Sequence, residues 1–232
     1  MFIASQIQFE PPEPGCVFTG CSFDVSAYSP TFFDHFSIAC PDSINASVPK
    51  RQAEFLAGRY LARAALDALG SPASHVGIGT HRQPLWPDGY SGSISHADGG
   101  AVALVAARRD RVIGVDLETI LSAHTAQTVG PQILTQTEAT WLPSSKGDYL
   151  ANLTLIFSAK ETLFKALNPR VGEFFDFHAA ECVGEITSSK VSLALTQNLG
   201  ATLSAGRVFE VSWRFWNGQV LTWLSAPWVE AP

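Results

Sequence analysis

The chain has 232 residues and 46% hydrophobic content, which is enough to bury a core in one large domain or two small ones. Its formal charge of −6 and pI near 5.4 exclude broad binding to nucleic acid or to anionic membranes. Any basic site must therefore be local, and small anions are the expected ligands.

Cysteine spacing and hydropathy indicate the cellular compartment in which the protein is expected to act. Cys16, Cys21, Cys40 and Cys182 show no Cys-x-x-Cys spacing, which favours a reduced, cytoplasmic protein. The N-terminus has no cationic start followed by an apolar core, and no apolar span approaches the ~20 residues of a membrane helix. We expect neither a signal peptide nor a membrane span.

The N-terminal third begins irregularly and then becomes helical. Residues 1–45 are rich in Pro, Ser, Phe and Asp, and we expect a wrapping arm of short strands and loops, with one strand around residues 15–26. A helix is expected over residues 47–69, capped by Ser47 and with Pro49 in its first turn.

This expected helix carries Lys50, Arg51, Arg59 and Arg63 on one side. Basic residues on a helix commonly form a solvated face. However, Lys50 and Arg51 add side-chain charge to the positive end of the helix dipole, which favours a phosphate.

A proline-rich turn after a short strand near residues 76–80 presents Arg82 and Trp86. A guanidinium beside an aromatic ring could hold a phosphate and a purine, or Trp86 could simply pack under the loop. The strand Ser93-Ile94-Ser95-His96 then enters a tight turn. His96 is a candidate phosphate donor or general base, and a structural histidine is the alternative.

The apolar run 101–107 turns and returns through residues 112–118, which predicts an antiparallel hairpin. The returning strand ends in Gly114-Val115-Asp116-Leu117-Glu118. Alternation along a strand puts Asp116 and Glu118 on one face. Such a pair is either a platform for a divalent cation or a solvated strand end.

Two short helices or loops, broken at Gly130-Pro131 and at Pro143, are expected within residues 119–145. The spacing Thr135-Gln136-Thr137-Glu138 is typical of a capping box and would start the second of them. A longer helix is expected over residues 147–167, ending before Asn168-Pro169.

The longer helix supplies a third carboxylate, Glu161, flanked by Lys160 and Lys165. Glu161 and Lys165 are four residues apart and share a helix face, where an exposed salt bridge is the alternative interpretation. Three carboxylates and two cations suggest a metal with phosphate. Hard oxygen ligands fit Mg²⁺ better than Zn²⁺, which would require Cys and His at tight spacing.

The final third is strand-like, with a hairpin signal at Asn217-Gly218. Trp213, Phe215 and Trp223 are expected to pack against the longer helix. Four strands are expected, over residues 174–183, 190–195, 208–215 and 219–226.

Three segments, in this order, resemble the signatures of the 4′-phosphopantetheinyl transferases of the Sfp type, in the enterobactin-synthase component D branch. They are Ser-x-Ser-His at 93–96, Gly-Val-Asp-Leu-Glu at 114–118 and Phe-Ser-x-Lys-Glu-x-x-x-Lys at 157–165. The segment 50–59 and the Arg82 turn resemble further parts, so the resemblance covers roughly residues 50 to 170. Phe157 stands where many relatives have Trp, and we expect the packing to survive this change.

The resemblance implies an α+β fold of two similar halves related by a pseudo-two-fold axis. Each half would be a long helix packed on antiparallel strands, with coenzyme A in the cleft between them. Residues 1–120 would carry the wrapping arm, the coenzyme A 3′-phosphate side and the first metal carboxylates. Residues 121–232 would carry the lysine-glutamate helix and the C-terminal sheet. Family members of this kind are typically monomers.

The activity implied is Mg²⁺-dependent transfer of the 4′-phosphopantetheine moiety of coenzyme A to a serine of an apo acyl, peptidyl or aryl carrier protein. Adenosine 3′,5′-bisphosphate would be released. The resemblance leaves open whether the carrier serves siderophore, nonribosomal peptide, polyketide or fatty acid biosynthesis. A non-catalytic coenzyme A or nucleotide-binding regulatory module is the alternative. Because carrier proteins are commonly acidic, a local basic and apolar docking patch that includes Arg170 is expected.

The resemblance also implies roles for the matching residues. Asp116, Glu118 and Glu161 would bind the metal, and Asp116, Glu161 and Lys165 would carry the catalysis. Glu161, directly or through a metal-bound water, would take the proton from the partner serine. The residues expected to bind coenzyme A are Arg51, Arg59, Arg82, Ser95, His96, Lys165 and, as a second lysine, Lys160.

Overall fold

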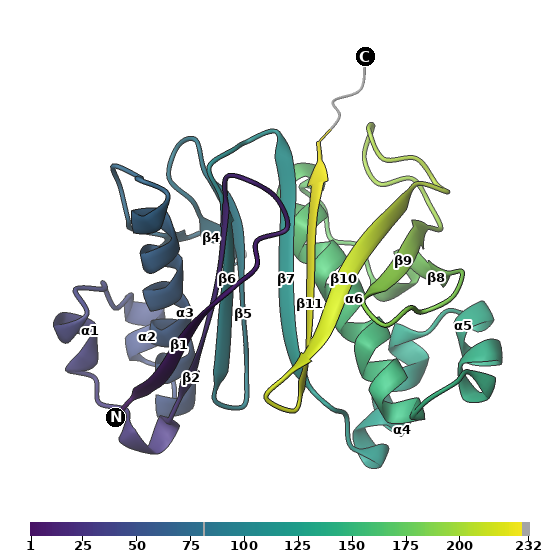
Figure 1. Cartoon of the computed structure of the whole chain (residues 1–232), viewed down its shortest axis with the longest axis horizontal. Coiled ribbons are helices and arrows are strands. Elements are labelled where there is room, and N and C mark those ends of the chain that lie inside the picture. Colours follow the sequence, from purple (N-terminus) through teal and green to yellow (C-terminus); the bar gives the residue numbers. More distant parts are fainter. Residues whose placement is uncertain (81, 229–232) are drawn as a thin grey trace. The chain divides into compact units, whose positions relative to one another are not determined.

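The computed structural model describes residues 1–80 and 82–228 and divides into two units, Met1–Arg111 and Val112–Pro232. Each unit combines a long helix with its own sheet, which confirms the α+β prediction (Figure 1). The division proposed from the sequence, at residue 120, assigns the strand Arg111–Thr119 to the first half. In the structure this strand belongs to the sheet of the second unit.

The first unit packs helix α3 on a four-stranded antiparallel sheet of order β1-β2-β6-β5. The main elements are β1 (Ile3–Phe9), β2 (Cys16–Phe23), α3 (Pro49–Ala68), β5 (Ser91–Ala97) and β6 (Gly100–Ala106). The smaller elements are a 3-10 turn (Val25–Ala27), α1 (Phe32–His35), α2 (Asp42–Asn45), and the paired strands β3 (Gly77–Ile78) and β4 (Pro84–Leu85).

Helix α3 forms where the sequence predicts it because apolar residues recur along it at three- and four-residue spacing. Ala62, Ala65 and Leu66 are spaced in this way and are fully buried in the core of this unit. The expected cap is wrong: Val48 is the N-cap residue and makes no side-chain cap bond, while Pro49 occupies the first turn. Proline suits this position because the first helical N–H groups have no partner within the helix.

The N-terminal arm contains a strand, β1, that the sequence analysis did not place within the expected short strands and loops. β1 is paired with β2 on one side only and lies at the edge of the sheet, and most of its side chains are exposed or half-buried. Its polar and apolar residues alternate only over its second half, from Gln6 to Phe9, which is a short signal.

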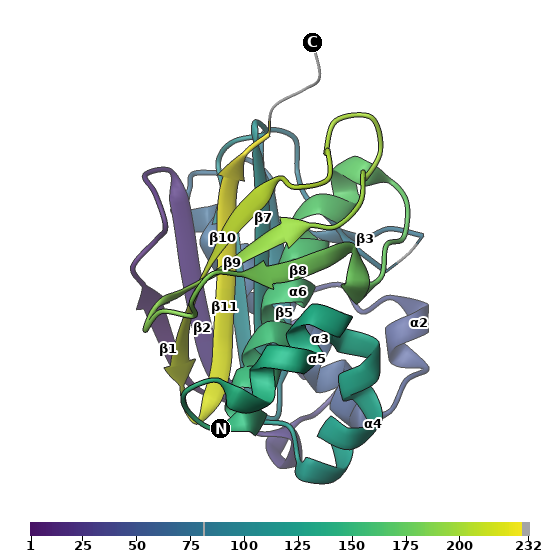
Figure 2. The same ribbon diagram turned by 90° about the vertical axis from the view of Figure 1, so that its right-hand side faces the viewer.

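The second unit packs α6 on a five-stranded sheet of order β7-β11-β10-β9-β8. Figure 2 shows α4 and α5 beside α6. The elements are β7 (Arg111–Thr119), α4 (Ala123–Ile133), α5 (Gln136–Trp141), α6 (Tyr149–Val171), β8 (Ala180–Val183), β9 (Lys190–Leu195), β10 (Val208–Trp216) and β11 (Gln219–Pro227), with 3-10 turns at Leu142–Ser144 and Phe177–Ala179.

The predicted hairpin of residues 101–107 with 112–118 is wrong. β6 pairs with β2 along one edge and with β5 along the other, so neither edge is left for β7. β7 pairs with β11 instead. A short turn between two apolar runs therefore joins two sheets here.

Two helices continue past prolines at which the sequence analysis expected a break or an end. Helix α4 continues through Pro131, and α6 continues through Pro169 to a C-cap at Gly172, whose φ is 74°. Both prolines lie near the C-terminus of their helix, where few hydrogen bonds remain to be lost. The predicted capping box is confirmed, with Thr135 and Glu138 exchanging both hydrogen bonds.

The C-terminal hairpin is confirmed, since Asn217 and Gly218 both have positive φ, at 51° and 77°. The first of the four expected strands is shorter than predicted and covers only β8. Phe215 was expected to be buried, but its side chain is 53% exposed and packs edge-on against the ring of Trp213.

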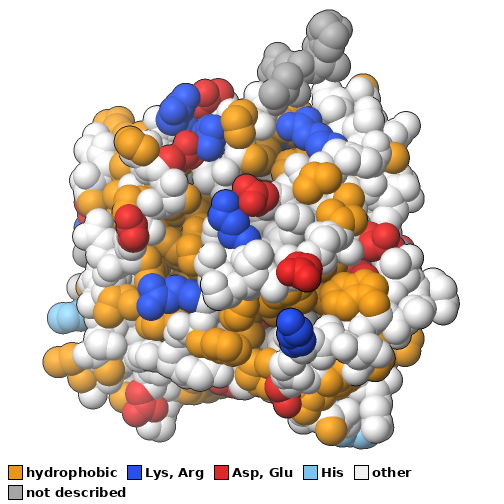
Figure 3. Space-filling model, turned by 45° about the vertical axis from the view of Figure 1, so that its right-hand side comes forward, with side chains coloured by type: hydrophobic (Ala, Val, Ile, Leu, Met, Phe, Trp, Pro, Cys, Tyr) orange, Lys and Arg blue, Asp and Glu red, His pale blue; other side chains and the backbone are white. Residues whose placement is uncertain are grey.

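Within residues 1–80 and 82–228, no helix is long and apolar enough to cross a membrane. On the face shown in Figure 3, lysine and arginine side chains are interspersed with acidic ones and do not form a continuous basic field.

Candidate active site

The candidate active site of the second unit begins where β7 meets α6. A Cβ atom at Gly114 would lie 2.1 Å from the backbone oxygen of Thr162, so only glycine allows this close approach. Since side chains alternate along a strand, Asp116 and Glu118 share the helix-facing side with Gly114. The prediction of two carboxylates on one face therefore has a structural basis in the contact of β7 with α6.

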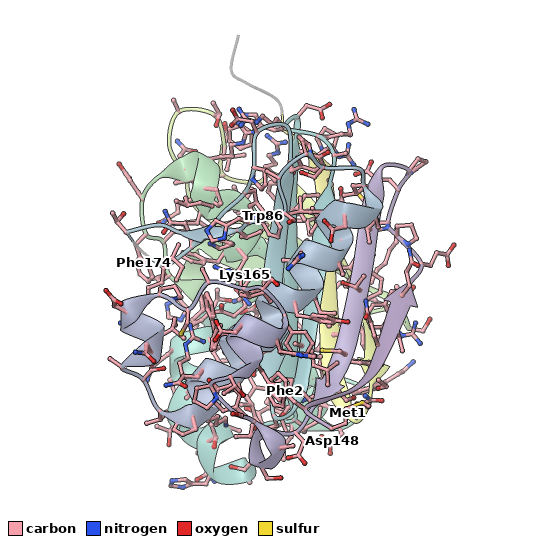
Figure 4. All side chains as sticks on the ribbon, turned by 90° about the vertical axis from the view of Figure 1, so that its left-hand side faces the viewer. Met1, Phe2, Trp86, Asp148, Lys165 and Phe174 are labelled. Carbon is pink, nitrogen blue, oxygen red and sulfur yellow. The ribbon has the colours of Figure 1, made fainter. Side chains whose placement is uncertain are left out.

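Asp116 is almost fully buried and is held by two residues of α6. The hydroxyl of Ser158 donates to Oδ2 at 2.8 Å, and the ammonium of Lys165 donates to Oδ1 at 2.6 Å. Ser158, Glu161 and Lys165 are spaced by three and four residues, which places them along one side of the helix. Lys165 is labelled in Figure 4.

The ammonium of Lys165 interacts electrostatically with all three carboxylates of this cluster. Burial disfavours its ammonium, but the nearby carboxylates of Asp116, Glu161 and Glu118 outweigh burial and raise the pKa of Lys165. For Glu161, burial is the main cause that raises the pKa of the carboxyl, and Asp116 adds to it while Lys165 opposes it. The three predicted carboxylates thus interact with one ammonium.

The donor set fits Mg²⁺ in its chemistry. Among the described residues, no three acidic, His or Cys side chains are arranged as a ready-made metal site. Mg²⁺ commonly binds to one or two protein carboxylates and completes its shell with water and substrate phosphates. Asp116, Glu118 and Glu161 provide oxygen donors of this kind, beside a lysine that can bind phosphate.

Lys160 does not belong to this cluster, and its proposed role as a phosphate ligand is corrected. Its side chain is 1% exposed, and its ammonium donates to Glu138 Oε2 at 2.6 Å and to the Ile133 backbone oxygen at 2.8 Å. Burial lowers the pKa of Lys160, an effect that Glu138 opposes. A five-residue step on a helix turns Lys160 away from Lys165.

In the first unit, the structure brings Arg51 and His96 together. Arg51 Nη1 lies 2.9 Å from His96 Nε2, and since a guanidinium only donates, Nε2 accepts. Glu54 joins them, with Oε2 3.8 Å from Arg51 Nη1 and 3.6 Å from His96 Nδ1. This Arg51–His96 pair is a cationic group at the start of α3, as the sequence analysis expected.

Arg59 lies further along the same helix and is largely committed to the fold. Its Nε and Nη2 donate to the backbone oxygens of Val76 and Gly77, both at 3.0 Å, and its guanidinium stacks 4.6 Å from the Phe55 ring centroid. Burial, together with the charge of Arg51, lowers the pKa of Arg59 to about 10. Arg59 lines a cavity of about 370 Å³ whose walls also include Arg63 and His75.

Ser95 and Arg82 are placed apart from the Arg51–His96 pair. Ile94 lies against α3, because a Cβ at Gly58 would be 2.7 Å from its Cγ2, and alternation puts His96 on the same side. Ser95 therefore faces the other side of β5 and is buried. Arg82 is exposed in the loop between β3 and β4, with a positive φ of 65°.

Sequence reasoning missed Glu54, Glu138, Ser158 and Thr222. Glu54 could have been found, because it lies four residues after Lys50 on a helix face already singled out. Glu138 was noted only as part of a capping box. Thr222 carried no local signal, because its partner Ser158 is 64 residues away.

Two family models cover most of the chain. The 4′-phosphopantetheinyl transferase N-terminal domain matches residues 41–106, and the 4′-phosphopantetheinyl transferase superfamily matches residues 112–223. The chain belongs to the 4′-phosphopantetheinyl transferase superfamily, in its Sfp-type branch, and is an enzyme that transfers the 4′-phosphopantetheinyl group to carrier proteins.

Curated relatives agree with this assignment. The chain is similar to enterobactin synthase component D of Salmonella typhimurium (strain LT2), with 38% identity over 88% of this chain and 83% of that protein. It is also similar to 4′-phosphopantetheinyl transferase Svp of Streptomyces mobaraensis, with 33% identity over 82% of this chain and 79% of that one. A third relative is 4′-phosphopantetheinyl transferase Npt of Nocardia iowensis, with 37% identity over 62% of this chain and 64% of that protein.

Proposed function

We propose that this enzyme takes the 4′-phosphopantetheine arm from coenzyme A and attaches it to a serine of an apo carrier protein, with Mg²⁺ bound at Asp116, Glu118 and Glu161. The observation that carries the proposal is the interaction of these three carboxylates with Lys165. A bound Mg²⁺ would neutralise the charge that develops on the pyrophosphate oxygens.

The residues of α6 supply the remaining chemistry. The serine oxygen of the carrier forms a bond to the β-phosphorus of the pyrophosphate while the bond to the bridging oxygen breaks, and adenosine 3′,5′-bisphosphate leaves. Glu161 takes up the serine proton, a role that requires its carboxylate to be ionised. Lys165 donates to the phosphate oxygens and stabilises their charge in the transition state.

The Arg51–His96 pair is the proposed site for the 3′-phosphate of coenzyme A. The guanidinium and the imidazole can both donate to a phosphate once His96 is protonated, and the N-terminus of α3 adds positive backbone dipole. Arg59 and the exposed Arg82 are proposed to contribute to the adenosine end. Ser95 faces away from His96, so we propose that it supports β5 and does not bind the ligand directly.

The relatives named enterobactin synthase component D favour a carrier protein of siderophore assembly by a nonribosomal peptide route. Carriers of polyketide or fatty acid synthesis are the alternatives. We also propose that the enzyme acts in the cytoplasm as a monomer, and that Arg170 contributes to the docking of an acidic carrier.

The decisive experiment is the intact mass of a panel of apo carrier proteins after incubation with this protein, coenzyme A and Mg²⁺. We expect a gain of one phosphopantetheinyl group, strongly reduced by Glu161→Gln and by Lys165→Met. Lys190→Met is a matched control, because Lys190 is an exposed lysine paired with Glu210 on the sheet. Binding of coenzyme A without any mass gain would favour a non-catalytic binding module.

A further inference from the structure

A chain of buried hydroxyl groups leads from β11 to the carboxylate of Asp116. Its members are Thr162 and Ser158 on α6 and Thr222 on β11, and all three residues are fully buried. Ser158 and Thr162 are four residues apart, so both face the same strand. No motif identified in the sequence included Thr222.

Counting protons gives the chain one direction. A hydroxyl has one proton, and that of Ser158 is donated to Asp116 Oδ2 at 2.8 Å. The oxygens of Ser158 and Thr222 are 2.9 Å apart, and since the Ser158 proton is already donated, only Thr222 can donate in this contact. Its one proton is shared with the Ser158 backbone oxygen, which lies 3.0 Å away. The oxygens of Thr162 and Thr222 are 2.6 Å apart, which makes Thr162 the donor to Thr222.

The donors of the chain therefore run from Thr162 through Thr222 and Ser158 to Asp116, with the proton of Thr222 shared with the Ser158 backbone oxygen. Hydrogen bonds arranged head to tail polarise one another, which strengthens the last bond of the series. That bond holds Oδ2, while Oδ1 faces the ammonium of Lys165. One oxygen of the Asp116 carboxylate is thus bound by Ser158 and the other by Lys165.

We propose that Ser158 and Thr222 are positioning residues that fix the rotamer of Asp116, so that Oδ1 is presented to the metal and to Lys165. The inference rests on the proposed function, since it assigns the second sphere of the proposed Mg²⁺ site. Neither residue touches substrate or metal. Residues that orient a metal ligand typically change metal affinity by roughly 10–100-fold when they are replaced.

The chain could otherwise serve only to fasten β11 to α6, and substitutions at Thr222 separate the two roles. Thr222→Val keeps the shape of the side chain and removes the hydroxyl. Thr222→Ser keeps the hydroxyl and removes a methyl group. In Thr222→Val, Thr162 still has an acceptor, because its hydroxyl lies 3.3 Å from the Thr222 backbone oxygen. Ser158→Ala removes the last bond of the chain.

The first measurement is the affinity for Mg²⁺ by titration calorimetry with coenzyme A present. We expect Ser158→Ala to weaken it roughly 10-fold, Thr222→Val by a smaller factor, and Thr222→Ser by less than about twofold. The second is the Mg²⁺ dependence of transfer, in which the half-saturating concentration should rise in the same order while the rate at saturating Mg²⁺ recovers. Thermal unfolding midpoints show that each variant is folded at the temperature used.

Two results would overturn the inference. One is an unchanged Mg²⁺ affinity in folded Ser158→Ala and Thr222→Val. The other is equal weakening by Thr222→Ser and Thr222→Val, which would make the effect one of packing. Failure of the proposed function is distinguishable, because calorimetry requires no carrier protein. If the unsubstituted enzyme binds Mg²⁺ and modifies no carrier, the order of affinities still decides the inference.

Discussion

Glu161 is half-buried on α6, beside Lys165 and on the helix face that contacts Asp116 of β7. Burial raises the pKa of its carboxyl, and Lys165, whose pKa is itself raised, limits the rise. A carboxylate of this kind binds a proton more readily than an exposed one. Proton binding by Glu161 bears on the pH dependence of transfer, and the cost of ionising its carboxyl in the folded state bears on the free energy of unfolding. Each can be measured separately.

The first prediction concerns the pH dependence of transfer. Glu161 must be ionised both to bind Mg²⁺ and to accept a proton, so we expect an acid limb on which the rate falls as pH falls. Initial rates from intact mass measure this limb. A rate that does not fall on the acid side, in enzyme that remains folded, would contradict the assignment of Glu161 as the base.

The second prediction concerns stability. A carboxyl whose folded pKa is raised contributes stability below its ordinary value, and that contribution is lost as pH rises through the folded pKa. Glutamine does not titrate. The free energy of unfolding of Glu161→Gln relative to the unsubstituted chain should therefore increase from about pH 5 to about pH 8. Urea unfolding at both pH values tests this, and an unchanged or decreasing difference would be evidence against it.

At the scale of elements, two contacts fasten α6 in place. The buried pair of Lys160 with Glu138 connects α6 to α5, and Glu138 Oε1 also accepts from the backbone N–H of Cys182 on β8. The close approach of Gly114 to Thr162 connects α6 to β7. Together they set the position of the helix that carries Glu161 and Lys165.

The third prediction follows from the buried ion pair. Lys160→Met leaves the charge of Glu138 buried without its partner and should cost about 3–5 kcal/mol of unfolding free energy. Adding Glu138→Gln should recover part of this loss. Lys190→Met, which breaks an exposed pair, should change stability by less than about 1 kcal/mol. Urea unfolding compares the variants, and a Lys160→Met protein as stable as the control would refute the role of the pair.

The fourth prediction concerns Gly114. Gly114→Ala should destabilise the chain by about 3 kcal/mol, because the added methyl group meets the Thr162 backbone oxygen and the strand or helix must shift. Gly130→Ala on α4 is the matched control. Its Cβ would meet nothing closer than 3.9 Å, and replacing a helical glycine should stabilise by up to about 1 kcal/mol. Equal effects of the two substitutions would argue against the close contact.

At the scale of the whole molecule, each unit has a hydrophobic core of its own. Leu61 belongs to the core of the first unit and Leu163 to a core of the second. Regions with separate cores can open separately. A loss of packing in one core should then increase local opening mainly in the unit that contains it.

The fifth prediction tests this separation. Leu61→Ala and Leu163→Ala should each cost about 2–5 kcal/mol, because both side chains are almost fully buried. Amide hydrogen exchange read by mass spectrometry should accelerate within residues 1–111 in the first variant and within residues 112–232 in the second. Equal acceleration throughout the chain in both variants would show that the cores open together.

Much of the fold was predictable because its signals are local. The apolar spacing of α3 and α6, the capping box at Thr135 and the turn at Asn217-Gly218 depend on residues within one or two turns of one another. The candidate residues Asp116, Glu161 and Lys165 were also found, through strand alternation, helix spacing and the order of family motifs.

Strand partners, burial and second-sphere contacts were decided only by the tertiary structure. The sequence placed β7 beside β6, because adjacent apolar runs predict a hairpin, yet both edges of β6 are occupied by other strands. It gave Lys160 as a second phosphate ligand after Lys165, although Lys160 pairs with Glu138 in the core. Thr222 meets Ser158 across 64 residues, and such a contact leaves no periodic pattern in the sequence. Local chemistry sets which groups are present, and chain packing decides which of them reach one another.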